Sequence, residues 1–275
     1  EFDKEVYLKD KYLIAKNRAL DKLISKRLIE YLFQPIVDIE TCQIYGYKSF
    51  IKSNIDEFKT VLEIFAAAES QSRLYDVQML IINKTIDLLM NNRETLGEKR
   101  IFISIIMVQN ISEEDFQEIS NKIKYISKNI VIELTRNLCL FQQDLLERIS
   151  MLRDATDGII ALGNDGRGYI DESELFSIKP DIFEIDKGIL GEIYNDIDKQ
   201  NMFKNLVAFC NDNNIKVLAE QIDTEEELDI AISLGVNMVQ GNYFEPKLTE
   251  LKKDIKENKK NKILNIKNKL KKISN

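Results

Sequence analysis

The sequence predicts an α/β fold, a (β/α)₈ TIM-like barrel whose first two strands form an antiparallel pair. Eight short apolar runs alternate with helical patterns along most of the 275 residues, which is the number and order of elements that such a barrel requires. Several runs, among them 101–106 and 130–134, are almost continuously apolar. Strands buried on both faces have this composition, so we expect helices to cover the sheet.

Individual elements follow from the spacing of the apolar residues. Residues 1–29 are predicted to be an N-terminal helix that caps the barrel or links it to another module, because Leu20, Leu23 and Ile24 share one helical face. The predicted strands are 31–37, 44–51, 101–106, 130–135, 158–162, 182–186, 215–219 and 237–240. The predicted helices between them are 57–69, 75–92, 112–127, 140–155, 189–212 and 224–234. The first two strands are too close in sequence for a helical crossover, so they should pair antiparallel.

No repeat or low-complexity linker interrupts residues 30–248, which we interpret as one barrel domain. Residues 249–275 are Lys-rich and are expected to form a helical tail. From Leu251 onward ten lysines accompany Asp254 and Glu257, a balance of +8 that leaves −15 for the rest of a chain of net charge −7. We interpret the tail as a solvated helix. Nucleic-acid binding is not expected, because the body is acidic and no aromatic stacking motif accompanies the lysines.

The composition excludes several classes of function. The chain has no histidine, which rules out histidine acid–base catalysis and histidine metal ligands. Its three cysteines, Cys42, Cys139 and Cys210, are widely spaced and indicate neither a zinc site nor a disulfide framework. The sequence contains no run of 18 apolar residues and no signal peptide. We therefore expect a cytoplasmic protein, attached to a membrane only through a region upstream of Glu1.

Three segments carry a resemblance to a known family. Residues 31–38 read YLFQPIVD, residues 215–220 read IKVLAE and residues 239–244 read VQGNYF. In this order they resemble the EAL domains of bacterial signal-transduction proteins, over roughly residues 30–248. The resemblance implies an antiparallel first strand pair and hydrolysis of the messenger cyclic di-GMP. It also implies two Mg²⁺ or Mn²⁺ ions, held by carboxylates and an amide at the strand ends.

The chain departs from the family pattern at the positions that hold the metals or activate water. The family's metal-binding Glu and Asn, its two metal-bridging Asp residues and its catalytic Lys correspond here to Lys48, Ser104, Gly163, Asn164 and Glu184. A lysine at the first of these positions places a positive charge beside the expected metals, which costs several kcal/mol at intermediate dielectric. Our hypothesis is that Lys48 or Arg167 pairs with Glu133, Glu184 or Glu220 and fills the former metal site.

Other positions keep or approximate the family residue. The resemblance leaves as candidates for ligand contact Gln34, Lys52, Glu133, Glu220, Asp223 and Gln240. Lys52 replaces an Arg and lacks its fork of donors, and Asp223 replaces a longer Glu. Each of these residues also has a purely structural interpretation. We expect no catalytic residue and no cofactor, with Glu133 the vestige of the metal site.

The leading hypothesis is an inactive EAL-like domain that serves as a regulatory or protein-interaction module with an unidentified protein partner. The alternative is a receptor that binds cyclic di-GMP without cutting it. A third interpretation is an active phosphodiesterase with a rearranged site. A homodimer is a further candidate, because EAL domains often pair through the loop that here spans 163–168.

Overall fold

The computed structural model describes residues 2–104, 112–124, 126–135, 150, 153, 158–163, 175, 178–188, 191 and 196–274. Its eight strands are β1 (Ile29–Asp38), β2 (Ile44–Ser53), β3 (Arg100–Ser104), β4 (Ile130–Thr135), β5 (Ile159–Gly163), β6 (Ile182–Ile185), β7 (Lys216–Ala219) and β8 (Met238–Gln240). They close into a barrel in chain order. β1 pairs antiparallel with both β2 and β8, and the other neighbours are parallel. The predicted barrel and its antiparallel opening are confirmed.

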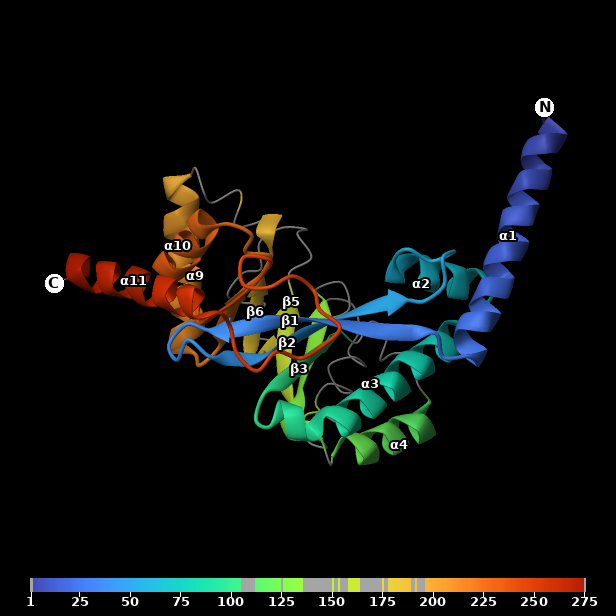
Figure 1. Cartoon of the computed structure of the whole chain (residues 1–275), viewed down its shortest axis with the longest axis horizontal. Helices are drawn as coiled ribbons and strands as arrows, with labels where there is room; N and C mark the ends of the chain where they lie inside the picture. The colour runs from blue at the N-terminus through green and yellow to red at the C-terminus, as the bar shows by residue number, and fades with distance from the viewer. Residues whose placement is uncertain are drawn as a thin grey trace.

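Helices lie outside this barrel (Figure 1). They are α1 (Phe2–Ser25), α2 (Val61–Ser70), α3 (Leu74–Leu96), α4 (Glu113–Ile123), the 3₁₀ helix η2 (Ser127–Asn129), α9 (Ile197–Asp212), α10 (Glu225–Ser233) and α11 (Glu257–Ser274). Capping boxes fix the starts of α2 and α10, where the hydroxyls of Thr60 and Thr224 accept from backbone N–H groups three residues on. The predicted helix at 140–155 and the end of the predicted strand at 101–106 fall on residues outside the described ranges, apart from single positions.

The β1–β2 hairpin is the longest pairing in the sheet, and it extends from the barrel toward α2 and α1 (Figure 1). Its register shifts where Ile36 pairs with Gly46 but Val37 pairs with Ile44, which is a local bulge. Gly46 is required at this point, because a Cβ there would lie 2.5 Å from the carbonyl oxygen of Arg100 in β3. The hairpin thus brings Lys48 into the barrel wall, directly opposite Gln34.

Apolar side chains fill the barrel and the space beneath the helices. The barrel interior is packed with Ile36, Phe102, Val131, Ala161, Ile182, Leu218 and Met238. A second cluster joins Leu20 and Leu23 of α1 to Ile64 and Ala68 of α2. The C-terminal half of α1 is therefore packed on α2, while its first half extends away from the body (Figure 1). A domain boundary at residue 29 or 248 stays a prediction.

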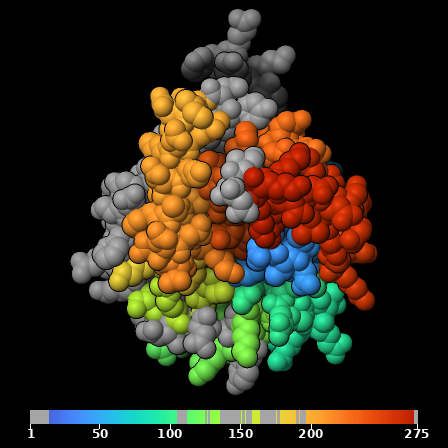
Figure 2. All heavy atoms as spheres, turned by 90° about the vertical axis from the view of Figure 1, so that its left-hand side faces the viewer, coloured from blue at the N-terminus to red at the C-terminus, as the bar shows by residue number. Residues whose placement is uncertain are grey.

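The Lys-rich tail differs from the solvated helix that we expected. Residues 249–256 precede the helix, and Ile263 and Ile266 of α11 are buried. Lys262 pairs with Glu225 of α10, and Lys267 donates 3.2 Å hydrogen bonds to the carbonyl oxygens of Ile39 and Glu40. Figure 2 shows α11 in red beside α10 in orange and above the blue β1–β2 turn. The tail docks because its apolar stripe and its lysines both find partners on the acidic body.

Two further expectations concerned the cysteines and the membrane-spanning segments of the chain. Cys42 and Cys210 are buried and in no disulfide, and Cys139 lies outside the described residues. None of the helices that the structure describes combines the length and the apolar composition needed to cross a membrane.

Candidate functional site

Four charged side chains meet at the C-terminal end of the barrel. Lys48 comes from β2, Glu133 from β4, Glu184 from β6 and Glu220 from the residue after β7. The Lys48 Nζ atom lies 3.0 Å from Glu133 Oε1 and 3.4 Å from Glu184 Oε2, and it also forms an ion pair with Glu220 Oε1. The predicted pairing of Lys48 is therefore confirmed with all three glutamates. We call these four residues the Lys48 cluster.

The cluster is largely removed from water. The side chains of Lys48, Glu133, Glu184 and Glu220 are 15%, 6%, 4% and 11% exposed. Burial by itself lowers the pKa of Lys48, but the three carboxylates outweigh burial and raise that pKa well above its usual value. Burial raises the pKa of Glu184 well above its usual value, and Glu133 adds to the rise while Lys48 opposes it. Burial likewise raises the pKa of Glu220, against the opposing charge of Lys48.

The Lys48 cluster has one ammonium for three carboxyl groups, so its net charge is −2 if all three carboxyl groups are ionised. Oε1 of Glu133 and Oε1 of Glu184 are buried and receive no well-directed hydrogen bond from the described residues, although Lys48 Nζ lies 3.0 Å from Glu133 Oε1. A proton on Glu184 removes one negative charge and supplies a donor in this region. The raised pKa of Glu184 therefore comes first from its burial and second from the neighbouring carboxyl group of Glu133, which Lys48 offsets only in part.

Gly163 makes room for the cluster. A Cβ at this position would lie 3.0 Å from Glu184 Oε2, and Gly163 is the residue opposite Glu184 in the β5–β6 ladder. The neighbouring strand end contributes Ser104, which is opposite Glu133 in the β3–β4 ladder. Neither Gly163 nor Ser104 offers a carboxylate.

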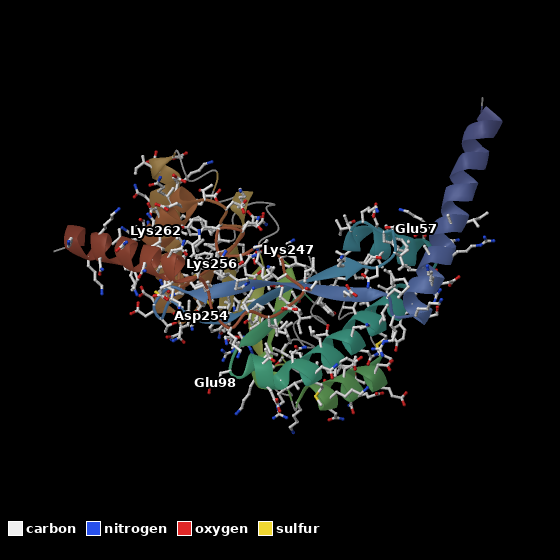
Figure 3. The ribbon with its side chains drawn as sticks, viewed as in Figure 1. Glu57, Glu98, Lys247, Asp254, Lys256 and Lys262 are labelled. Atoms are coloured by element: carbon white, nitrogen blue, oxygen red, sulfur yellow. The ribbon has the colours of Figure 1, made fainter. Side chains whose placement is uncertain are left out.

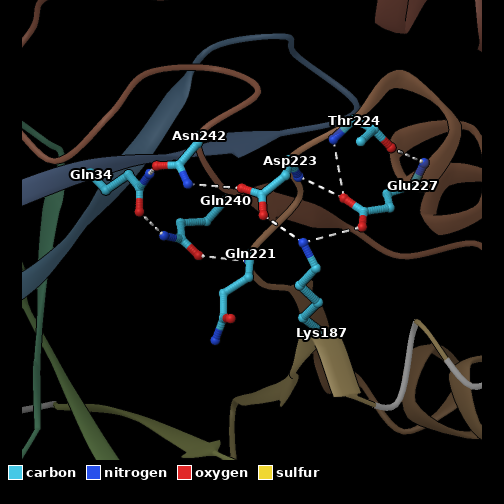
Figure 4. Close-up of polar contacts among 8 residues, drawn as sticks. All are labelled: Gln34, Lys187, Gln221, Asp223, Thr224, Glu227, Gln240 and Asn242. Carbon is cyan, nitrogen blue, oxygen red and sulfur yellow. Dashed lines mark hydrogen bonds and ion pairs between the residues drawn. The ribbon is translucent and has the colours of Figure 1, made fainter.

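A chain of hydrogen bonds holds the polar residues on the other side of the mouth (Figure 4). Gln34 donates to Asn242 Oδ1 at 3.0 Å and to the carbonyl oxygen of Glu245 at 2.8 Å. Gln240 donates to Gln34, and its own side-chain oxygen accepts from the backbone N–H of Gln221 at 3.2 Å. The side chains of Gln34 and Gln240 are both buried. The hydrogen bonds described above satisfy their amide groups within the protein.

The chain of hydrogen bonds continues to Asp223. Asn242 donates to Asp223 Oδ1 at 2.8 Å, and Lys187 Nζ lies 2.5 Å from Asp223 Oδ2 and 3.4 Å from Glu227 Oε1. The hydrogen bond from Lys187 is the main cause that lowers the pKa of Asp223. Sequence reasoning missed Lys187, although its place just after β6 was a usable signal.

Two adjoining cavities open at this end of the barrel. The first, of about 430 Å³, we call the apolar-walled cavity; beside the Lys48 cluster it is lined by Ile51, Val61, Ile81 and Ile103. The second, of about 290 Å³, we call the polar-walled cavity; it is lined by Gln34, Asp223, Gln240 and Asn242. Lys48, Phe50, Glu220 and Lys247 border both. A larger cavity of about 740 Å³ lies at the opposite end of the barrel, near Tyr45 and Arg100 and away from the Lys48 cluster.

Comparison with known proteins agrees with this geometry. Residues 17–247 match the family described as EAL domain. The chain belongs to the EAL domain family. Among curated proteins, this EAL chain is 24% identical over 220 residues to the blue light- and temperature-regulated antirepressor BluF of Escherichia coli K12. The match covers 78% of the chain and 53% of BluF, so the chain spans about half the length of that relative.

Solved EAL structures share the fold at low sequence identity. The EAL domain of Xanthomonas citri FimX, in complex with c-diGMP, is 16% identical with a TM-score of 0.74, over 90% of this chain and 99% of that one. The MucR phosphodiesterase in complex with c-di-GMP is 18% identical with a TM-score of 0.71, over 85% and 97% of the two chains. Klebsiella pneumoniae BlrP1, with manganese and c-diGMP, is 19% identical with a TM-score of 0.68, over 80% and 56%.

At the positions where the resemblance implies metals, this EAL domain has a lysine ammonium among three carboxylates. Oxygen atoms of Glu133, Glu184 and Glu220 lie within 4.8 Å of one another, a spacing that a metal can use. However, the Lys48 ammonium already lies among these oxygens. Two positive charges about 4 Å apart repel by about 4 kcal/mol even at an effective dielectric constant of 20. The lysine therefore competes with any metal for the same oxygens.

The remaining predicted site residues divide between the two cavities of the EAL barrel. The apolar-walled cavity contains Lys48, Ser104, Glu133, Gly163, Glu184 and Glu220, and the polar-walled cavity contains Gln34, Asp223 and Gln240. Lys52 borders neither of them and lies opposite Glu30 in the β1–β2 ladder. Asn164 and Arg167 fall outside the described residues. Ligand contact by any of these side chains stays a prediction.

Proposed function

We propose that this chain is a regulatory EAL domain that does not hydrolyse cyclic di-GMP and acts by contacting a partner protein. The observation that carries the proposal is the position of Lys48 among Glu133, Glu184 and Glu220. Hydrolysis of a phosphodiester by two metals needs both cations and a water activated between them. Here an ammonium takes the place of a metal, and the family's catalytic lysine is replaced by Glu184.

Regulation without hydrolysis also agrees with one of the curated relatives. BluF, which matches most of this chain, is named as an antirepressor, and that word describes a regulator. A domain that keeps the barrel but has a lysine in its metal site can still bind a partner protein without hydrolysing a substrate. The partner protein and a homodimer are part of this proposal. Of the loop at 163–168, through which we expected dimers to form, only Gly163 lies within the described residues.

An assay of hydrolysis tests the first half of the proposal. The purified chain is incubated with cyclic di-GMP and Mn²⁺, and linear product is measured by chromatography, with the MucR phosphodiesterase as positive control. We expect no product. Turnover by the unmodified chain above that of a Lys48→Ala variant would contradict the proposal, because the lysine would then support the reaction.

The second candidate is a receptor that binds cyclic di-GMP without cutting it. The two adjoining cavities at the barrel mouth favour it, since they leave space beside Gln34 and Gln240. Against it, both amides are already satisfied by neighbours within the protein. Calorimetric titration with the dinucleotide, with and without Mg²⁺, separates the candidates. Micromolar binding supports the receptor, and no binding supports a module that acts only through protein contacts.

A further inference from the structure

Lys247 is a lysine at the barrel mouth that the sequence did not single out. It lies between β8 and α11, in a segment held on β1 by two hydrogen bonds between the backbones of Phe33 and Leu248, of 2.7 and 2.9 Å. Its Nζ atom lies 3.6 Å from the centroid of the Phe50 ring. Figure 3 shows Lys247 near the middle of the molecule, well apart from Lys262 of α11. Backbone pairing thus fixes this lysine over the site.

The ammonium of Lys247 has no carboxylate partner among the residues that the structure describes. It makes a cation–π contact with the face of Phe50. The nearest acid in sequence, Glu245, lies 3.5 Å from Lys256 instead. The pKa of Lys247 is lowered first by partial loss of water and second by the positive charge of Lys48. An anion placed above Phe50 would therefore meet the uncompensated ammonium of Lys247. The charge of Lys48 is already neutralised by Glu133, Glu184 and Glu220, so Lys247 alone supplies the attraction.

Apolar residues continue from Phe50 into the apolar-walled cavity. Ile51 of β2, Val61 of α2, Ile81 of α3 and Ile103 of β3 form its sides. The cavity, of about 430 Å³, falls within the usual range for small-molecule sites, about 300–1,000 Å³. A ligand that fits both the apolar walls of this cavity and the ammonium of Lys247 has an aliphatic body and one anionic end.

We propose that this cavity binds a small amphiphilic anion, an aliphatic carboxylate whose head group lies at Lys247 and whose chain lies along Ile51, Val61 and Ile81. Each methylene buried in such a site contributes about fourfold in affinity, and the ammonium fixes the orientation of the chain. The face of Phe50 that Lys247 covers is closed to stacking by a nucleotide base. The proposal goes beyond the regulatory function proposed above, and its cavity adjoins the polar-walled cavity that favours cyclic di-GMP binding.

Titration calorimetry of the full chain with octanoate tests the proposal. Octanol serves as a probe that keeps the aliphatic chain without the charge, and acetate as one that keeps the carboxylate without the chain. We expect one octanoate per chain, bound at least about tenfold more tightly than either probe. Affinity should rise from hexanoate to octanoate, because each added methylene is buried. No octanoate binding, or equal affinity for octanol, would overturn the proposal.

Variants of one exposed lysine keep the test independent of folding. Lys247→Gln should weaken octanoate binding about tenfold, whereas Lys247→Arg should retain most of it because the charge remains. Lys269→Gln, on the exposed face of α11, removes the same charge elsewhere and should leave the affinity unchanged. Equal losses in the Lys247→Gln and Lys269→Gln variants would indicate nonspecific attraction to a positive surface and would overturn the assignment.

Discussion

A Cβ added to Gly163 would lie 3.0 Å from Oε2 of Glu184, so the residue at the end of β5 sets the space for the residue at the end of β6. The resemblance predicts that both positions depart from the family pattern, and this contact leads us to expect that the two residues are energetically coupled. Glu184 needs this space because its side chain is buried beside Lys48. The packing around the ion pairs of Lys48 therefore depends on the absence of a side chain at position 163.

Gly163→Ala should destabilise the fold by about 1–3 kcal/mol, the usual cost of overpacking a buried site. Urea unfolding measures the change. The matched control is Gly191→Ala, where an added Cβ has no neighbour within 4 Å and the effect should be small. Combining Gly163→Ala with Glu184→Ala should recover much of the loss. Strictly additive effects in this double-mutant cycle would contradict the coupling.

Lys48→Met should destabilise the protein by about 3–5 kcal/mol, because it leaves three buried carboxyl groups without their cation. The midpoint of urea unfolding at neutral pH is the measurement. Lys59→Met is the control, since that lysine is 72% exposed and its ion pair with Asp56 is long, at 3.7 Å; exposed pairs contribute about 0–1 kcal/mol. Similar losses in both variants would mean that the Lys48 cluster contributes no more than a surface pair.

Removal of the lysine should also open a cation site. In Lys48→Ala the oxygens of Glu133, Glu184 and Glu220 remain within reach of one another, and Mn²⁺ takes such oxygen ligands. We expect Mn²⁺ to raise the Tm of Lys48→Ala, because an ion that binds only the folded state stabilises it. The unmodified chain should show no such shift. A shift of equal size in the unmodified chain would contradict competition between Lys48 and the metal.

The stability should fall as the pH rises, in part because of Glu184. Its folded pKa is raised above the ordinary value of 4.5, so its contribution is complete below that value and is lost as the pH rises through the folded pKa. Glu184→Gln keeps the shape and removes the titration, so stability between about pH 5 and about pH 9 should decline less than in the unmodified chain. Glu57→Gln, an exposed acid (Figure 3), should leave the decline unchanged. An unaltered slope in Glu184→Gln would show that Glu184 does not titrate as described.

Much of the fold could be predicted from local patterns. The apolar run at 130–134 and the short 39–43 connection determine a buried strand and an antiparallel hairpin, because periodicity and loop length act over a few residues. The tail was predicted less well. Its Lys-rich composition indicated a solvated helix, yet Ile263 is buried and Lys262 pairs with Glu225, since the docking surface comes from segments distant in sequence.

The candidate site divides in the same way. From the sequence, the family resemblance predicted that Lys48 and Glu184 replace a metal ligand and a catalytic lysine, and the apolar runs placed these residues on or next to predicted strands. Three contacts became visible only in the folded chain: Lys48 pairs with three glutamates at once, Gly163 leaves space for Glu184, and Lys247 reaches the site over Phe50. These contacts join residues far apart in the chain. Closure of the barrel sets their distances and their burial, and no local pattern encodes either quantity.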